Sequence, residues 1–157
     1  MTTPRDRISF GTHTFPFSGL HTGLEALPSL PMLPIRVRFP TGRWSLAFNA
    51  VLDTGSTRSL LSRPAAEELE MPLDGDTESM RGAGGPFPTV GAVRDVALVD
   101  AQFPEVTCWE VAGIEFRVPA VEGALDFSVL GWDLLRLFDV SVSHRKGRIE
   151  LRLAHEI

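Results

Sequence analysis

The chain is poor in the features that define several large classes of protein. It has one cysteine, Cys108, so no disulfide can form within it, and this suits a reducing compartment. A lone cysteine in the strand-like run FPEVTCWEV is expected to be a small buried hydrophobic residue. No apolar run approaches the roughly 20 residues of a membrane-spanning helix, and the first 20 residues lack the continuous apolar stretch of a signal peptide. We expect a soluble protein with no membrane partner, and a cytoplasmic location is favoured, although the sequence leaves the compartment unknown.

The chain also lacks an excess of basic residues. Fifteen Lys and Arg stand against 20 Asp and Glu, which gives a formal net charge of −5. Nucleic-acid binding generally requires a basic surface, so no nucleic-acid partner is expected. The four histidines, at positions 13, 21, 144 and 155, lie near the two ends of the chain, so we predict neither a metal site nor a cofactor. No Gly-x-Ser-x-Gly motif of a serine hydrolase occurs.

The length of 157 residues suits a single domain. Residues 1–34 are rich in Gly, Pro, Thr and His, and prolines at 28, 31 and 34 exclude a helix at the end of this segment. We therefore predict an N-terminal extension or arm over residues 1–34 and a folded domain over residues 35–157.

The folded domain has the pattern of a mainly β protein. IRVRF alternates apolar and basic residues as a half-buried strand does, and a PTGR turn joins it to a second strand, WSLAFNAVLD. MPLDGDTESM is predicted to be a loop that leads into a strand. Further strands are predicted over TVGAVRDVALVD, within FPEVTCWEVAGIEFRVPAV, and in a closing hairpin whose turn is HRKG. Two short helices are predicted, one over residues 63–70 with Ser62 as N-cap and one over residues 133–138.

The stretch FNAVLDTGSTRSLLS places one acid, Asp53, on a tight turn directly after an apolar strand. Gly55 has no Cβ, so a ligand or another backbone segment can approach closely. The hydroxyl groups of Thr54 and Ser56 can donate hydrogen bonds. Such an acid can act as a general base, as a metal ligand, or only as the cap of its own turn. The tetrapeptide by itself does not decide between these roles.

The order of the motifs favours one family. The acid turn is followed by a short helix, by the glycine-rich hairpin tip RGAGGPFP, by more strands, and then by SVLGWDLL, where two apolar residues and a glycine precede a helix. This order resembles the retropepsin-like aspartic proteases, of the bacterial or cellular single-lobe type, over about residues 35–153. The resemblance implies a closed, acid-protease-like β-barrel lobe with a flap hairpin. It places the flap tip at Gly82, Ala83, Gly84 and Gly85.

The resemblance also implies a mechanism and a partner. Members of this family use two carboxylates that share a proton, and this chain has one acid turn, so Asp53 would be catalytic in a homodimer that binds a peptide or protein substrate. Thr54 would form a hydrogen bond across the dimer, Ser56 would bond the outer carboxylate oxygen, and Gly55 would contact the substrate. The substrate pocket would be lined by Leu52, Phe87, Val90, Val129, Leu130 and Gly131.

Two departures from the family pattern leave other functions open. Thr57 and Trp132 occupy the positions at which retroviral members commonly carry an ion pair, and Pro86 and Pro88 lie in the flap. One alternative is therefore a peptide-binding or dimerisation module of the same fold with little or no activity. Another is an unrelated β protein in which Asp53 only caps a turn.

Overall fold

A computed structural model describes residues 12–18, 30–82 and 84–154 of the chain. Nine strands and two short helices form in these segments. They follow the sequence in the order β1 (His13–Pro16), β2 (Met32–Val37), β3 (Phe48–Leu52), α1 (Arg63–Glu68), β4 (Glu78–Gly82), β5 (Gly85–Val99), β6 (Thr107–Pro119), β7 (Val129–Leu130), α2 (Trp132–Leu135), β8 (Phe138–Ser143) and β9 (Arg148–Leu153). The predicted mainly β class with two short helices is confirmed.

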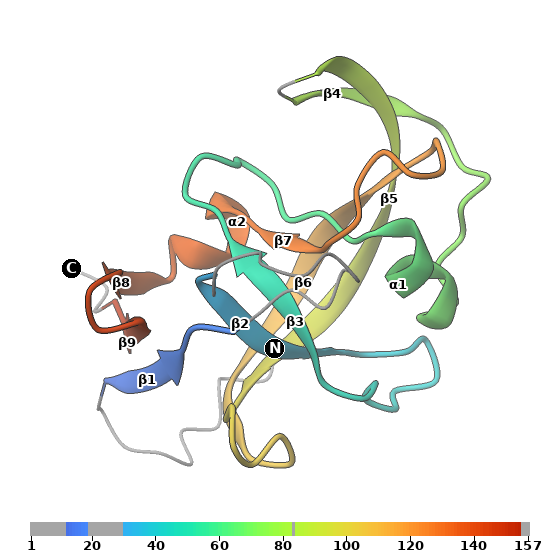
Figure 1. Cartoon of the computed structure of the whole chain (residues 1–157). Coiled ribbons are helices and arrows are strands. Elements are labelled where there is room, and N and C mark those ends of the chain that lie inside the picture. Colours follow the sequence, from blue (N-terminus) through green and yellow to red (C-terminus); the bar gives the residue numbers. More distant parts are fainter. Residues whose placement is uncertain (1–11, 19–29, 83, 155–157) are drawn as a thin grey trace.

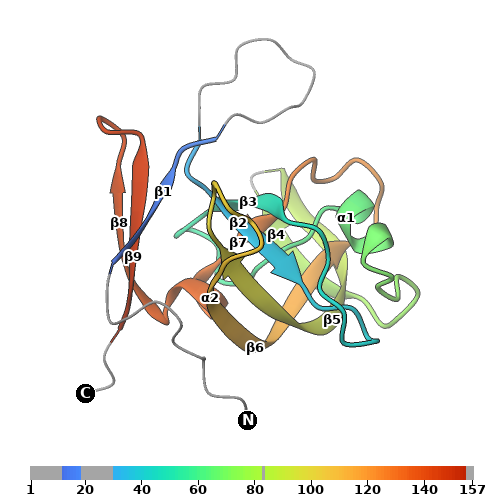
Figure 2. The same ribbon diagram turned by 90° about the horizontal axis from the view of Figure 1, so that it is seen from below.

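The described strands form two open sheets. The larger sheet has the order β4-β5-β2-β3-β7, with β6 paired to β5, and the smaller one has the order β1-β9-β8. Figure 2 shows the smaller sheet to one side of the larger one, with α2 between them. The expected closed β-barrel is therefore wrong for the described part of the chain, in which neither sheet returns to pair its two edge strands.

The central strand β2 begins earlier than the alternating pattern suggested. It contains Pro34, which lies opposite Asn49 of β3. On the other side of β2, pairing with β5 begins only at Ile35. At Pro34 the described part of the sheet therefore has a neighbouring strand on the β3 side only, which is a position where a strand tolerates proline. The division that we predict between residues 34 and 35 falls within β2, and β1 of the predicted arm pairs with β9.

The strands β4 and β5 form a long hairpin, whose far end projects beyond the rest of the chain at the top of Figure 1. Its last pair is Gly82 with Gly85, and Gly85 has a φ of 105°, a conformation that glycine adopts without strain. From Thr89 to Val99, β5 then pairs with β6, over the full length of β6.

Both helices begin close to the predicted positions. Ser62 caps α1 by accepting a hydrogen bond from the N–H of Ala65, as the sequence indicated. The helix α2 begins at Trp132, one residue earlier than predicted, and ends at Leu135 rather than at Phe138, which opens β8.

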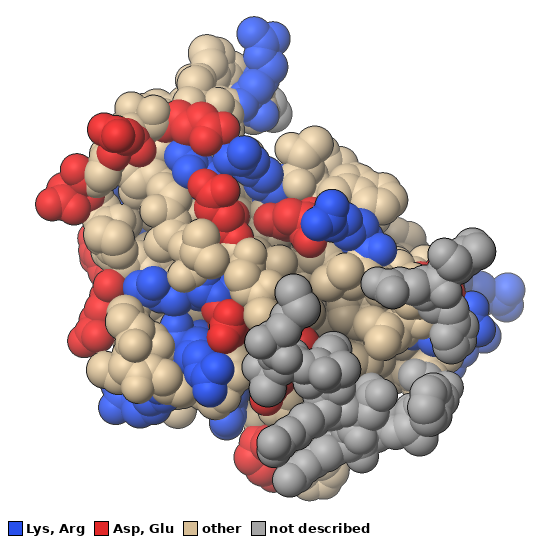
Figure 3. Space-filling model, turned by 180° about the vertical axis from the view of Figure 1, so that it is seen from behind, with Lys and Arg blue, Asp and Glu red and all other residues tan. Residues whose placement is uncertain are grey.

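The hydrophobic core lies between the sheets and the two helices. Its fully buried members include Phe15, Ile35, Leu61, Phe116 and Leu134. Cys108 is buried within this core, as predicted. No helix in the described segments is long and apolar enough to cross a membrane. Acidic and basic side chains are interspersed over the face shown in Figure 3.

Candidate active site

Asp53 directly follows β3, on a turn that faces solvent. Its backbone N–H donates to the carbonyl of Leu130 in β7 at 3.0 Å, and β7 itself runs parallel to β3. The carboxylate oxygen Oδ1 accepts a hydrogen bond from the N–H of Gly55 at 2.9 Å. Asp53, Thr54 and Gly55 are all exposed. The backbone of Asp53 is thus held by the sheet, while its carboxylate remains accessible.

Residues at the start of α2 contact the acid turn and support its shape. The N–H of Trp132 donates to the carbonyl of Ser56 at 2.8 Å. A Cβ atom at Gly131 would lie 2.6 Å from the carbonyl oxygen of Arg58 and 2.7 Å from that of Ser56. Only glycine fits at this contact, because real Cβ atoms do not approach other atoms so closely. Gly131 therefore supports the turn by close packing and does not line an open pocket.

The hydroxyl group of Ser56 has a different partner from the one expected. It donates to the carbonyl oxygen of Arg58 at 2.7 Å and not to the outer carboxylate oxygen of Asp53. Since a hydroxyl group has only one proton to donate, this bond uses it within the loop. Ser56 thus stabilises the shape of the turn.

A second acid, Asp133, connects the turn to α2, a role that the sequence analysis did not identify. Its carboxylate accepts hydrogen bonds from the N–H of Ser59 at 2.9 Å, from the hydroxyl of Ser59 at 2.7 Å and from the N–H of Leu134 at 2.9 Å. The Ser59 hydroxyl also accepts a bond from the N–H of Gly131 at 3.1 Å. The two bonds between Ser59 and Asp133 join residues 74 apart in the chain, next to Thr57 and Trp132, the positions at which retroviral members carry an ion pair.

The predicted flap tip coincides with the end of the hairpin formed by β4 and β5. Gly82 and Gly85 form its last pair, Gly84 lies in the turn, and Ala83 lies outside the described residues. The ring of Phe87 packs against the backbone of Gly82, where a Cβ would lie 3.2 Å from the ring. The hairpin is observed, and its action as a flap stays a prediction.

The predicted pocket residues are mostly in the core. Leu52, Val90 and Leu130 are between 0% and 7% exposed and belong to the central cluster. Val129 is also buried, which leaves Phe87 as the only partly exposed member of the predicted set. In a single copy of the chain Leu52, Val90 and Leu130 therefore face the core and line no open subsite, and their contact with a substrate stays a prediction.

A groove of about 1030 Å³ lies elsewhere on the molecule. It is formed by the loop between β2 and β3, by α1 and by the segment that precedes β7, and its apolar lining includes Trp44, Leu46 and Phe127. Asp53 does not line it. The groove and the acid turn are therefore separate features of the surface.

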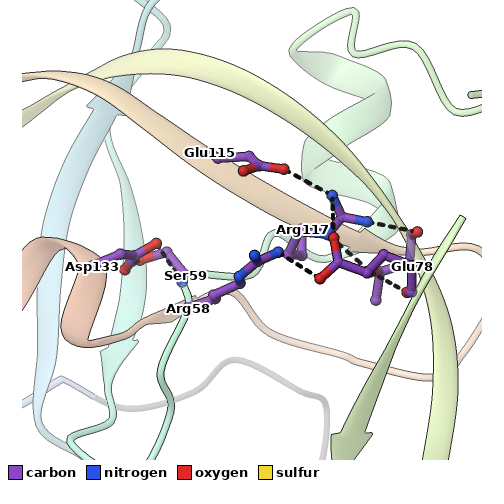
Figure 4. A network of polar contacts seen from close by, with 7 residues as sticks. Arg58, Ser59, Glu78, Glu115, Arg117 and Asp133 are labelled. Carbon is purple, nitrogen blue, oxygen red and sulfur yellow. Dashed lines mark hydrogen bonds and ion pairs between the residues drawn. The ribbon is translucent and has the colours of Figure 1, made fainter. Parts of the chain in front are cut away.

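The sequence analysis also did not identify Arg117 of β6, a buried arginine. It is 4% exposed, and its Nε and Nη2 donate to the hydroxyl and the carbonyl of Thr89 at 3.0 and 2.9 Å. Its Nη1 donates to Glu115 at 2.9 Å, and Glu78 of β4 lies 3.8 Å away. A Cβ at Gly91 would lie 3.1 Å from Cζ of this guanidinium, so the glycine leaves room for it. Figure 4 shows this cluster beside the pair of Ser59 and Asp133.

No group of three or more His, Cys, Asp or Glu that could hold a metal ion occurs in the described segments. His13 lies 3.1 Å from Asp100, and His144 packs edge-on against Phe17, with the ring centroids 5.5 Å apart. His21 and His155 lie outside the described residues.

Comparison with known proteins shows the family and the fold of the chain. The family model described as aspartyl protease matches residues 41–134, which is well over half of the chain. The chain belongs to the aspartyl protease family. The matched region extends from the loop before β3 to α2, and so it includes Asp53, the hairpin of β4 and β5, and Asp133.

The fold of this aspartyl protease family member is retropepsin-like. The chain is similar to a solved structure, a retropepsin-like aspartic protease from Rickettsia conorii, with a TM-score of 0.57 and 17% sequence identity. The match covers 94% of this chain and 96% of that one. At this identity the likeness concerns the fold alone. No curated protein matches the sequence.

Proposed function

We propose that the chain is an aspartic endopeptidase, in which Asp53 from each of two identical subunits forms the catalytic dyad. The observation that carries this proposal is the exposed carboxylate of Asp53, whose backbone is fixed by β7 while one hydrogen bond from Gly55 orients its side chain. An acid that served only as a turn cap would not need a turn whose shape is held by the close packing of Gly131 and by the hydrogen bonds of Asp133. Membership of the aspartyl protease family supports the same reaction class.

The proposed mechanism follows from two carboxylates held close together. Two such groups about 3 Å apart cannot both ionise readily, so they share one proton. The ionised carboxylate takes a proton from a bound water, which attacks the peptide carbonyl, while the protonated carboxylate donates to the developing oxyanion. The C–N bond of the tetrahedral intermediate then breaks. The carboxyl group that took the proton from water passes it to the leaving amine, and the other carboxylate recovers its proton from a hydroxyl of the intermediate, so no covalent bond to the enzyme forms.

The proposal requires a homodimer, since the chain has one Asp-Thr-Gly turn. Trp132 supports an interface at this place, because the residue is 51% exposed although its N–H is bonded to the acid turn. Tryptophan is enriched in protein interfaces, and here it stands where retroviral members carry a charged residue. A peptide would lie extended between the two acid turns and the two hairpins, where strand-like hydrogen bonds could hold it.

Replacing the proposed catalytic acid tests the function directly. The variant Asp53→Asn should lose about 10²- to 10⁴-fold in the rate of cleavage of an unstructured protein, because an amide cannot accept a proton from water. Asp76→Asn is the matched control, since Asp76 is also exposed and followed by threonine but lies outside the acid turn. Rates are measured from acidic to neutral pH at high protein concentration. Equal cleavage by the wild type and Asp53→Asn would refute the proposal.

A second candidate is a peptide-binding or dimerisation module with the same fold. It is favoured by Pro86 and Pro88, which lie in β5 at the hairpin opposite Arg81 and Ser79 and supply no N–H for a bound peptide. Binding of an extended peptide without cleavage at any pH between about 3 and 8 would favour this candidate. A chain that stays monomeric at high concentration would count against the endopeptidase.

A further inference from the structure

The side chain of Arg58 connects the acid turn to the base of the hairpin. Its carbonyl oxygen accepts the bond from Ser56 and packs against Gly131, so its backbone belongs to the support of the turn. Its guanidinium extends in the other direction, and Nη1 lies 3.1 Å from Oε1 of Glu78. Glu78 is the first residue of β4. Figure 4 shows Arg58 between the pair of Ser59 and Asp133 on one side and Glu78 on the other.

Glu78 is in turn attached to a rigid part of the sheet. Its carbonyl accepts a hydrogen bond from the hydroxyl of Thr89 at 2.8 Å, and Thr89 is fully buried in β5. Its second carboxylate oxygen, Oε2, lies 3.8 Å from Nη1 of the buried Arg117. The carboxylate of Glu78 therefore lies between two guanidinium groups, one from the acid turn and one from the sheet.

The two contacts of Glu78 differ in kind from the bonds that hold Arg117. Nη1 of Arg58 is shielded from solvent and makes no aligned hydrogen bond within the described residues, so its attraction to Glu78 is that of charge alone. Such an attraction depends weakly on angle and persists over a small displacement. Directional bonds to Thr89, in contrast, fix Arg117 in one place. The carboxylate of Glu78 is thus held by charge alone, and its contact with Arg58 at 3.1 Å is closer than its contact with Arg117 at 3.8 Å.

We propose that Glu78 is a positioning residue, which holds the base of the hairpin formed by β4 and β5 against the acid turn through Arg58. With the pair formed, the hairpin keeps its place relative to Asp53. With the pair broken, Arg117 still anchors the sheet through Thr89 and Glu115, and only the hairpin gains freedom. The consequence for peptide cleavage rests on the proposed function, whereas the consequence for the hairpin itself does not.

Hydrogen exchange tests the proposal without any activity. Glu78→Gln and Arg58→Gln should each speed amide exchange in β4 and in residues 85–89 by about two- to five-fold, the range expected for loss of one partly exposed ion pair. The double variant should exchange no faster than Glu78→Gln, because that variant already removes the contact that Arg58→Gln breaks. Arg58→Lys keeps the charge and should restore exchange close to the wild-type rate. Asp139→Asn is the matched control, because it breaks the exposed pair with Arg152, 2.9 Å apart on β8 and β9.

Peptide cleavage gives the second readout. In Glu78→Gln, KM should rise about two- to five-fold while kcat changes less than two-fold, because the hairpin binds the peptide and Asp53 is left in place. Added salt should raise KM of the wild type and leave KM of Glu78→Gln unchanged. Unchanged exchange in both single variants, or additive effects in the double variant, would overturn the proposal. If Asp53→Asn cleaved as well as the wild type, the proposed function would fall, and the exchange measurements would still decide the role of Glu78.

Discussion

The surroundings of Cys108 strongly change the acidity of its thiol. Burial, with the charge of Asp100 as a second cause, raises the pKa of its thiol from 9.0 to about 12. The folded state therefore keeps the thiol protonated at pH values where the unfolded chain ionises it, so its contribution to stability is complete below pH 9 and is lost as the pH rises toward 12. We expect the free energy of unfolding to fall by about 2 kcal/mol between neutral pH and about pH 10.5 through this group.

The composition makes this alkaline loss measurable. The chain has no tyrosine and one lysine, Lys146, so few other side chains titrate in this range. Urea unfolding of the wild type and Cys108→Ala at several pH values between 7 and 10.5 should show the loss in the wild type alone. A thiol reagent should react with Cys108 only after unfolding. Rapid labelling of the native protein at pH 8 would contradict the raised pKa.

At the scale of single residues, the sequence identified those that stand in a recognisable local pattern. Asp53 and Ser62 could be located because a turn and a helix cap have short signatures. Arg117 and Asp133 could not, since their partners lie 28 and 74 residues away in the chain. A charged residue within an alternating strand is normally exposed, and only the absence of a Cβ at Gly91 makes room for Arg117 inside the sheet.

The junction of β7 and α2 is the element on which the acid turn depends. Gly131 packs against the carbonyls of Ser56 and Arg58, so Gly131→Ala must push the turn away from α2. We expect a loss of about 1–3 kcal/mol in the free energy of unfolding, the usual range for an overpacked site. Gly75→Ala is the matched control, because nothing lies within 4 Å of a Cβ there and its φ is not positive. Urea unfolding of the two variants measures the difference, and equal stability would contradict the packing argument.

Most strands and both helices follow from the sequence, because alternation and capping are local signals. β2 extends beyond the prediction through Pro34, since the sequence does not reveal which side of a strand lacks a neighbour. The burial of Leu52, Val90 and Leu130 was not predicted, for a similar reason. Alternation identifies two faces of a strand, and the arrangement of the sheets decides which face meets the core.

At the scale of the whole molecule, a single acid turn per chain makes the assembly part of the proposed chemistry. A site built by two copies exists only in the dimer, so specific activity should fall steeply on dilution below the dissociation constant. Sedimentation over the same concentrations should show the dimer disappearing together with the activity. A monomer with undiminished specific activity would exclude a shared dyad.

Mixing subunits separates a shared dyad from a dimer of independent sites. When the wild type and Asp53→Asn exchange freely at equal concentrations, about half of the wild-type chains lie in mixed dimers, by random pairing. If each site needs Asp53 from both subunits, these mixed dimers are inactive and activity per wild-type chain falls to about half. With a nine-fold excess of Asp53→Asn it should fall to about a tenth. If each subunit acts alone, activity per wild-type chain stays constant at every ratio. An excess of Asp76→Asn, which keeps Asp53, should leave the activity per chain constant in either case when both kinds of chain are counted. A decline with Asp53→Asn alone therefore means that the two acid turns meet in one site.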